Sequence, residues 1–462
     1  MQKKKKDYKI DMCEGPILKK MLMFSIPLMC SSVLQLLFNA ADIVVVGRFA
    51  GDNSLAAVGS NTAIIGLITN LFVGLSIGAN VLVAKYYGGK NEKSLRRTVH
   101  TSMYLSIISG LILTIIGLIG TRQILIWMQT PDEVLDLATT YLRIYFLGMI
   151  ATMVYNFGSA ILRAVGDTKR PLYYLLWAGV VNVILNLIFV VGFKLDVAGV
   201  AIATVISQCI SAFLIVKCLM NENGGIHLDI HNLHIDRNML IQIIKIGLPA
   251  GFQGVIFSIS NVLIQSSINS FGPIVMAGNS AAANVEQFVY FAMNACYQAT
   301  ISFTSQNYGA GQFDRIKKVL TRGLLCVIFV GGVFGNIEVI FGKQLLSMYS
   351  PHEEVIEAGM VRLGFVARTY AIGGVMDVMV GALRGIGYSV MPMIVSLIGA
   401  CGLRIIWIET VFKMDNFHAV ETVYVSYPIT WLITSAIHII CFVWAFKKVK
   451  REYKGKFIEE VA

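Results

Sequence analysis

Three polar side chains interrupt an apolar stretch close to the N-terminus. Gln35, Asn39 and Asp42 are spaced i, i+4 and i+7, so a helix would bring them to one face. An ionised group inside a membrane-crossing helix costs about 2.5–3.5 kcal/mol on insertion scales, which makes such a residue functional by default. The carboxylate of Asp42 can bind a monovalent cation, or a proton when it is removed from water. The alternative is that Asp42 lies at the membrane surface and simply reaches water.

Two asparagines and a threonine offer further oxygen ligands. Asn182 and Asn186 lie one helical turn apart in GVVNVILNLIFVVGF, and Thr204 lies in the next apolar stretch. One carboxylate, two amide oxygens and a hydroxyl would suit a hard cation such as Na⁺. The competing interpretation is that these side chains only hold helices together, at under about 1 kcal/mol each. The predicted ion-coupling site comprises Asp42, Asn182, Asn186, Thr204 and Asn39, with Na⁺, if bound, at Asp42, Asn182 and Asn186.

The second half of the chain carries polar groups of its own within apolar stretches. Glu286 is followed along one helical stripe by Gln287 and Asn294, and Asp377 stands in GGVMDVMVGALRG. Such groups either contact a substrate or are neutralised locally, and Arg404 could pair with Asp377 or Glu409. The predicted substrate-binding residues are Gln35, Glu286, Gln287, Asn294, Asp377 and Tyr155.

Helices of membrane-spanning length must position these residues. Of the 462 residues, 56% are hydrophobic and 14% charged, a composition outside the range of soluble domains. It excludes a disordered chain, a disulfide-rich secreted module and a nucleic-acid reader. A helix needs about 20 apolar residues to cross a bilayer. We therefore predict an all-α membrane protein with twelve transmembrane helices, at 21–46, 55–84, 98–120, 138–161, 172–193, 197–219, 241–268, 274–304, 322–341, 357–381, 393–412 and 423–446.

Lysine and arginine residues set the predicted orientation. Twenty-eight of the 38 fall in one alternate set of connecting segments, which includes both ends of the chain, whereas five fall in the opposite set. Because basic residues are retained on the cytoplasmic side, both termini of a multi-pass cell-membrane protein are expected in the cytoplasm. The segment 220–240 is expected on that side too. Its histidines, in HLDIHNLH, are interpreted as solvated rather than as metal ligands.

The two halves of the chain are related by an internal repeat. LRAVG at 162–166 recurs as LRGIG at 383–387, which is 221 residues later. A tandem duplication of six helices gives two lobes of the same orientation, related by a parallel pseudo-two-fold axis along the membrane normal. The predicted N-terminal lobe is 1–219 and the C-terminal lobe is 241–462, joined by a cytoplasmic linker at 220–240.

The polar site of the first half does not repeat. At a spacing of 222 residues Asp42 corresponds to Ile264, and at 221 residues Asn186 corresponds to Trp407, so cation chemistry is predicted in the first lobe alone. Two equal halves suit a transporter that opens alternately to either side better than a channel or a receptor. The sequence contains no P-loop, GxSxG or HExxH motif, so an ATPase or hydrolase is not expected and the protein is predicted to be a secondary transporter.

Several segments together resemble the multidrug and toxic compound extrusion (MATE) family of transporters. They are NAADIVVVGRFAGDNSLAAVG, ILRAVGDTKRP, VAGVAIATVISQ, TSQNYGAGQFDRI and ALRGIGYSVMP, and the resemblance covers residues 15–450. It implies an antiporter in which influx of H⁺ or Na⁺ drives export of amphipathic, often cationic drugs by alternating access. The implied partners are small drug-like molecules and the lipid bilayer. The coupling ion takes the place of a cofactor, and a monomer suffices.

The resemblance also assigns roles to single residues. Asp42 matches the coupling carboxylate of the family's first helix, and Asn182 and Thr204 match residues of the same site. Many members carry aspartate where this chain has Asn186, and that departure favours protons over a two-carboxylate Na⁺ site. The alternative is a flippase for lipid-linked saccharides of the related superfamily. Such flippases have more cationic cavities, whereas the cations noted at membrane depth here are few.

Overall fold

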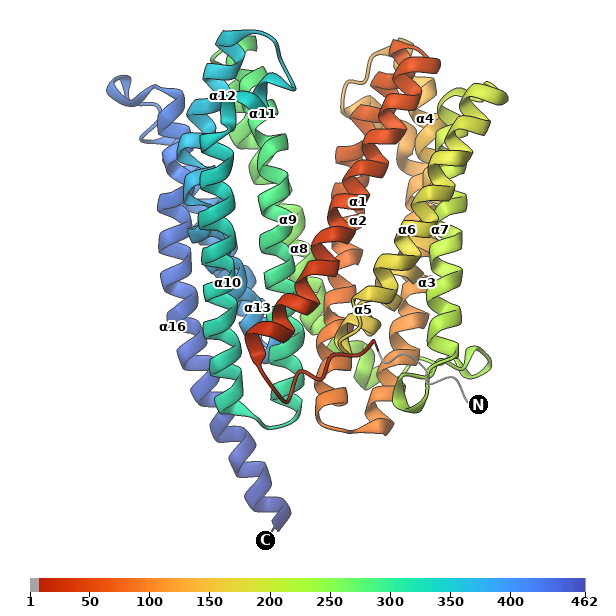
Figure 1. The fold of residues 1–462 in the computed structure, drawn as a ribbon, viewed down its shortest axis with the longest axis vertical. Helices are drawn as coiled ribbons and strands as arrows, with labels where there is room; N and C mark the ends of the chain where they lie inside the picture. The colour runs from red at the N-terminus through yellow and green to blue at the C-terminus, as the bar shows by residue number, and fades with distance from the viewer. Residues whose placement is uncertain (1–7, 462) are drawn as a thin grey trace. The chain divides into compact units, whose positions relative to one another are not determined.

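The computed structural model describes residues 8–461, and the basic leader at 3–6 lies outside this range. The described chain is helical, and no strand occurs within it (Figure 1). The first half contains α1 (Ile17–Phe49), α2 (Asp52–Gly88), α3 (Glu92–Trp127), α4 (Asp132–Leu147), α5 (Met149–Ala164), α6 (Lys169–Asn186), the π-helical segment η1 (Leu187–Gly192) and α7 (Asp196–Met220). Two short 3-10 turns follow, η2 (Gly224–Ile226) and η3 (Ile230–Asn232).

The second half repeats this order with more interruptions. It contains α8 (Arg237–Asn269), α9 (Pro273–Gly309), α10 (Phe313–Ile340), α11 (Gly342–Ser347), α12 (Glu353–Phe365), η4 (Ala367–Thr369), α13 (Tyr370–Gly385), α14 (Val390–Ser396), η5 (Leu397–Gly402), α15 (Leu403–Glu409), η6 (Asp415–Phe417) and α16 (Val420–Val461). Like η1, η5 is π-helical.

The predicted membrane stretches coincide with these helical segments. Within residues 8–461, ten segments are long and apolar enough to cross a membrane, and α4 with α5, bent by 48°, makes an eleventh. The remaining predicted stretch, 274–304, coincides with α9, which has 37 residues but carries polar side chains such as Glu286 along its length. The prediction of an all-α, multi-pass membrane fold is confirmed.

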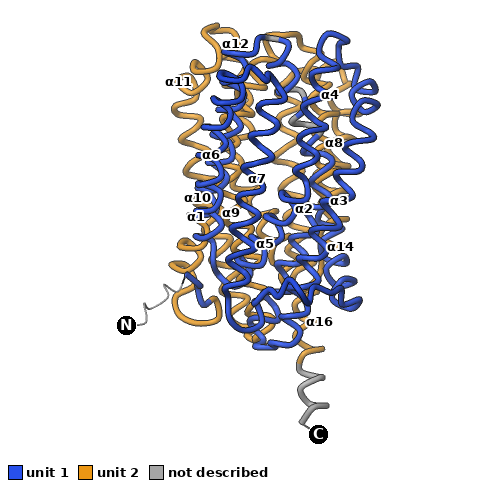
Figure 2. The backbone as a smooth tube through the Cα atoms, turned by 90° about the vertical axis from the view of Figure 1, so that its right-hand side faces the viewer, with its two compact units in different colours: residues 1–11, 27–251 blue, residues 12–26, 252–462 orange. Residues whose placement is uncertain are grey.

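Contacts divide the chain into two compact units (Figure 2). Unit 1 comprises 27–251 together with the residues up to Asp11, and unit 2 comprises 12–26 and 252 onward. In this division unit 1 ends inside α8, at Gly251. The first ten residues of α1 likewise belong to unit 2, although their place in the sequence had assigned them to the N-terminal lobe.

Glycines explain why the beginning of α8 packs within unit 1. Gly74 and Gly78 on α2 face Gly247 and Gly251 on α8, so two small-xxx-small pairs meet. A Cβ added at Gly247 would lie 2.6 Å from the Cα of Leu75 and 2.9 Å from the carbonyl oxygen of Gly74. The two backbones can approach this closely only because no side chain separates them.

Hydrogen bonds and ring packing hold residues 12–26 within unit 2. Asn307 on α9 donates to the carbonyl oxygen of Met12 at 3.1 Å, and Arg315 on α10 donates to the same oxygen at 3.1 Å. Farther along, the rings of Phe24 and Phe303 pack edge to face with centroids 5.8 Å apart. These contacts explain why α1 starts in one unit and ends in the other.

An ion-pair cluster lies just after the end of α7 in unit 1. Glu222 accepts hydrogen bonds from Lys9 at 2.7 Å and from Arg170 at 2.5 Å. Burial alone would raise the pKa of Glu222, but the hydrogen bonds from the two cations outweigh it and hold that pKa below its ordinary value. The carboxylate is therefore ionised at neutral pH and ties the start of the described chain to α6 and α7.

Candidate functional site

A carboxylate and three neutral polar side chains meet inside unit 1. Asp42 on α1 is buried, with 8% of its surface exposed, and its Oδ1 accepts a hydrogen bond from the Nδ2 of Asn186. The same Nδ2 lies 3.2 Å from the Oδ1 of Asn182. The Nδ2 of Asn182 donates in turn to the hydroxyl oxygen of Thr204 on α7 at 3.4 Å. The structure thus brings four of the five predicted ion-coupling residues into one network.

The hydrogen-bond directions in this network have a consequence for ligand binding. Thr204 gives its hydroxyl proton to the carbonyl oxygen of Val200 at 3.0 Å, so its oxygen is available as an acceptor. The Oδ1 of Asn186 is buried and has no hydrogen-bond partner within the described chain. Buried polar groups are nearly always paired, so an orphaned oxygen beside a carboxylate indicates a place for a donor or a cation.

Helix geometry places Asn186 opposite Asp42. Gly179, two turns before Asn186 on α6, faces Phe38, one turn before Asp42 on α1. A Cβ at Gly179 would overlap the ring of Phe38, so the absence of a side chain lets α6 approach α1. Directly after Asn186 the helix widens into η1. Because η5 in unit 2 is π-helical as well but follows no such polar pair, the widened turn belongs to the shared architecture.

Two tyrosines that the sequence did not single out lie near this site. Tyr141 and Tyr145 on α4 are within electrostatic reach of Asp42, and their rings stack with centroids 6.0 Å apart. Tyr141 is 6% exposed and belongs to a core cluster that also contains Val45 and Val46 of α1. These rings exclude water from one side of the carboxylate, which strengthens its attraction for a cation.

The remaining predicted residues of the first half lie outside this network. Gln35 and Asn39 are exposed on α1, whereas Asp42 is buried. No hydrogen bond within residues 8–461 links Asn39 to the Asp42 network, so its predicted place in the ion site is not supported by contacts. Tyr155 is buried on α5, and its hydroxyl donates to the carbonyl oxygen of Pro171 at 3.0 Å, an interaction that serves helix packing.

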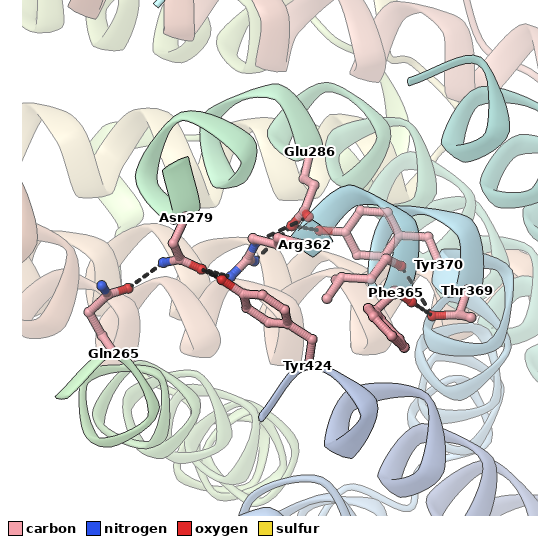
Figure 3. Close-up of polar contacts among 9 residues, drawn as sticks. Gln265, Asn279, Glu286, Arg362, Phe365, Thr369, Tyr370 and Tyr424 are labelled. Carbon is pink, nitrogen blue, oxygen red and sulfur yellow. Dashed lines mark hydrogen bonds and ion pairs between the residues drawn. The ribbon is translucent and has the colours of Figure 1, made fainter. Parts of the chain in front are cut away.

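In unit 2, Glu286 is neutralised by a partner that the sequence did not reveal (Figure 3). Arg362 on α12 donates from Nε to Oε1 of Glu286 at 3.1 Å and from Nη2 to Oε2 at 2.7 Å. Tyr370 donates to the same carboxylate at 3.0 Å. A bidentate, buried pair of this kind fixes both side chains, so Glu286 is held within unit 2 rather than presented alone for a substrate.

The other polar and charged residues singled out in the second half lie outside the Glu286–Arg362 pair. Asp377 is half-buried on α13, Gln287 is exposed and Asn294 half-buried on α9. Arg404 pairs with neither Asp377 nor Glu409. Its guanidinium donates to Thr430 at 3.0 Å and lies 3.9 Å from the ring centroid of Tyr427, and Glu409 pairs instead with Lys413.

Metal ligation is not built into the part of the chain that the structure describes. In residues 8–461 no group of three or more His, Cys, Asp and Glu side chains is arranged to hold a metal ion. The histidines of the connecting segment bond locally instead. His227 contacts the carbonyl oxygen of Glu222 at 3.1 Å, and His234 that of Asn232 at 2.8 Å.

Comparisons with known proteins agree with this architecture. A model of the MatE family matches residues 27–188 and 249–408, one block in each half of the chain. The chain is 27% identical over 444 residues to "Probable multidrug resistance protein YoeA" of Bacillus subtilis (strain 168), covering 94% of this chain and 95% of that protein. It is 28% identical over 396 residues to "Probable multidrug resistance protein YpnP" of the same organism, covering 85% and 88%.

A solved structure shares the fold. It is described as "Outward-facing conformation of a multidrug resistance MATE family transporter of the MOP superfamily", and it superposes with a TM-score of 0.88 at 21% identity, covering 98% of this chain and all of the other. The family match spans well over half of the chain and falls on both repeats. The resemblance predicted from the sequence is therefore confirmed, and the chain belongs to the MatE family of multidrug and toxic compound extrusion proteins.

Proposed function

We propose that this protein is a cation-coupled antiporter that exports amphipathic, often cationic compounds across the cell membrane by alternating access. The observation that carries the proposal is the buried Asp42, which accepts a hydrogen bond from the Nδ2 of Asn186, together with the unpartnered Oδ1 of the same amide group. Family membership and the names of YoeA and YpnP support drug-like compounds as the exported class.

The local geometry favours the proton as the coupling ion. A protonated Asp42 has a hydroxyl to donate, and the orphaned Oδ1 of Asn186 is the acceptor beside it. When the proton leaves, Asp42 carries a full charge against one amide donor, and a cationic compound can then replace the proton. Only one carboxylate is present in the Asp42 network, whereas a Na⁺ site with two carboxylates would need aspartate in place of Asn186.

The charges at membrane depth favour cationic substrates over lipid-linked pyrophosphates. Arg362 is already neutralised by Glu286, and Arg404 is packed against Tyr427. Neither guanidinium is presented alone for a phosphate group. The flippase function is therefore the less favoured alternative.

Transport in everted membrane vesicles tests the proposal. Ethidium uptake driven by a proton gradient should be high in the wild type and absent in Asp42→Asn, because the amide fills a similar volume but cannot exchange a proton. Tyr155→Phe serves as the matched control, since it removes a hydroxyl that bonds the carbonyl oxygen of Pro171 and takes no part in the Asp42 network. Wild-type transport by Asp42→Asn would refute the coupling role of Asp42. Uptake of a lipid-linked pyrophosphate instead of ethidium would favour the flippase.

The proposed orientation is tested separately. Asn223, in the connecting segment, is exposed, whereas the neighbouring Gly225 is buried and has no room for a side chain. A single cysteine at Asn223, in a variant without the eight native cysteines, should be labelled by an impermeant reagent only after the cells are opened. Labelling in intact cells would contradict a cytoplasmic location.

A further inference from the structure

A second carboxyl group lies beside the Glu286–Arg362 pair. Glu338 stands two residues before the end of α10 and is 6% exposed. Its Oε2 makes no hydrogen bond to any residue of the described chain. The charge of Glu286 acts on Glu338, and both carboxyl groups act on the hydroxyl of Tyr370. Unit 2 therefore contains two neighbouring buried carboxyl groups and one guanidinium.

Packing holds Glu338 in this position. One turn earlier on α10, Gly335 lies against η4, where an added Cβ would overlap the carbonyl oxygen of Ala367. The next residue of α10, Val339, packs against a core cluster that includes Val285 of α9 and Leu363 of α12. Glu338 is thus fixed between the elements that carry Glu286, Arg362 and Tyr370, and it cannot leave without opening this core.

Three of the five N–H groups of Arg362 already have partners, and none of these hydrogen bonds goes to Glu338. Arg362 uses Nε and Nη2 on Glu286, and its Nη1 donates to Asn279 at 2.8 Å (Figure 3). Asn279 is occupied as well, because its oxygen also accepts from Tyr424 at 3.1 Å and its amide donates to Gln265 at 2.7 Å. The faces of the guanidinium lie over the rings of Tyr424 and Tyr427, at 5.9 and 5.8 Å.

The charge count then requires a proton. The titratable groups that interact electrostatically with Glu338 are Glu286, which is paired with Arg362, and the hydroxyl of Tyr370. With both carboxyl groups ionised, the network would bury a net negative charge, which a low-dielectric interior strongly opposes. We propose that this network is a second proton-binding site, in which Glu338 holds one exchangeable proton while Arg362 neutralises Glu286.

Exposed acidic residues follow Glu338 in the chain, at the start of α12. Glu338 lies near the end of α10, and the neighbouring α12 begins with the exposed carboxylates Glu353, Glu354 and Glu357. Exposed carboxylates attract cations and raise their local concentration. In the predicted orientation this end faces outward, the side from which a coupling proton would enter. The role of this proton site in coupling rests on the proposed antiport, whereas the existence of the site does not.

Infrared spectroscopy of the purified protein tests the site without transport. The double variant Asp42→Asn, Asp377→Asn removes the other membrane-depth carboxyl groups, so the remaining protonated-carboxyl absorption at neutral pH should correspond to one group per molecule. Glu338→Gln should abolish it. Glu286→Gln should reduce it, because the positive charge of Arg362 is then no longer neutralised by Glu286 and favours the ionised form of Glu338. Arg362→Gln should instead increase the absorption to two groups, since neither carboxylate retains a counter-charge.

The pattern across the variants decides the proposal. If Glu286→Gln retains the full absorption, or if Glu338→Gln does not reduce it, the shared site is wrong. If Arg362→Gln does not fold, Glu338→Gln and Glu286→Gln still test the proposal. Proton-driven ethidium uptake then examines coupling, with Glu133→Gln, at an exposed position of α4 in unit 1, as a control that keeps wild-type transport. A spectrum with the expected pattern together with no proton-driven uptake by the wild type would overturn the proposed antiport and leave the proton site standing.

Discussion

Replacing Asn186 by aspartate should change the coupling ion. In the wild type the Nδ2 of Asn186 donates to Asp42, and losing a hydrogen bond to a charged group costs about 1.5–3 kcal/mol. The new carboxylate would also face Asp42. Two unit charges about 4 Å apart repel by about 4 kcal/mol at an effective dielectric constant of about 20. A Na⁺ ion between them removes both costs, so Na⁺ should be bound far more tightly than by the wild type.

The expected change is large enough to measure directly. About 4 kcal/mol corresponds to roughly a 1,000-fold gain in Na⁺ affinity, as an upper bound. Calorimetric titration of Na⁺ into the purified variant should show binding that the wild type lacks at the same concentrations. In vesicles, ethidium uptake should become dependent on a Na⁺ gradient.

A matched control separates geometry from charge. Asn39→Asp adds the same charge to α1, one turn from Asp42, but at an exposed position outside the network. It should leave Na⁺ binding and ion dependence close to those of the wild type. If Asn186→Asp binds Na⁺ no better than Asn39→Asp, the contact between Asn186 and Asp42 does not determine ion choice.

Three further predictions concern packing and pH. Gly179→Ala should lower proton-driven uptake at least tenfold, because the methyl group displaces α6 from α1. Gly66→Ala, at an open position of α2, should leave uptake unchanged. Equal effects of the two substitutions would refute the role of the close approach between α6 and α1. Gly247→Ala should destabilise the protein by about 1–3 kcal/mol through overpacking, whereas Gly332→Ala, which meets no atom within 4 Å, should be neutral or stabilising in thermal unfolding. Glu222→Gln should lower the melting temperature at neutral pH. Because the wild-type carboxyl has a pKa below its ordinary value, its stabilisation is complete above that ordinary value and is lost as the pH falls through the folded-state pKa, so the two proteins should converge in acid.

Much of the fold follows from patterns that a sequence displays openly. Lengths of apolar segments predict where helices cross the membrane, and the LRAVG repeat predicts two related halves. The Asp42 network could also be predicted, because polar residues at i, i+4 spacing inside apolar helices cost free energy and therefore indicate a function. The repeat sharpened this prediction, since Ile264 and Trp407 occupy the corresponding positions of the second half.

The network around Glu286 could not be predicted from these sequence patterns, for a physical reason. Arg362 follows the acidic start of α12, so it resembles a residue of a solvated helix end, and its partner Glu286 lies 76 residues away. Periodicity tells which face of a helix is polar but not which helix that face meets. One available signal was Glu338, which stands in the apolar stretch GGVFGNIEVIFG, because a charge at membrane depth is costly.

Gly179 and the glycine pairs of α2 and α8 illustrate the same limit. Glycine in a helix predicts either flexibility or a close approach, and the sequence does not tell which. The two GxxxG spacings, at Gly74 and Gly247, were signals that α8 could pack against α2. These spacings therefore favour close packing of the beginning of α8 on α2.

The exchange of helix segments between the units affects the order in which the protein can be completed during synthesis. Unit 1 lacks the first half of α8 until translation has passed Gly251, although its other helices are already made. Residues 12–26 are among the first to leave the ribosome, yet their partners in α9 and α10 are among the later ones. Neither unit can reach its final packing as an independent insertion intermediate, so a nascent chain halted before α8 should be a preferred target of membrane quality control.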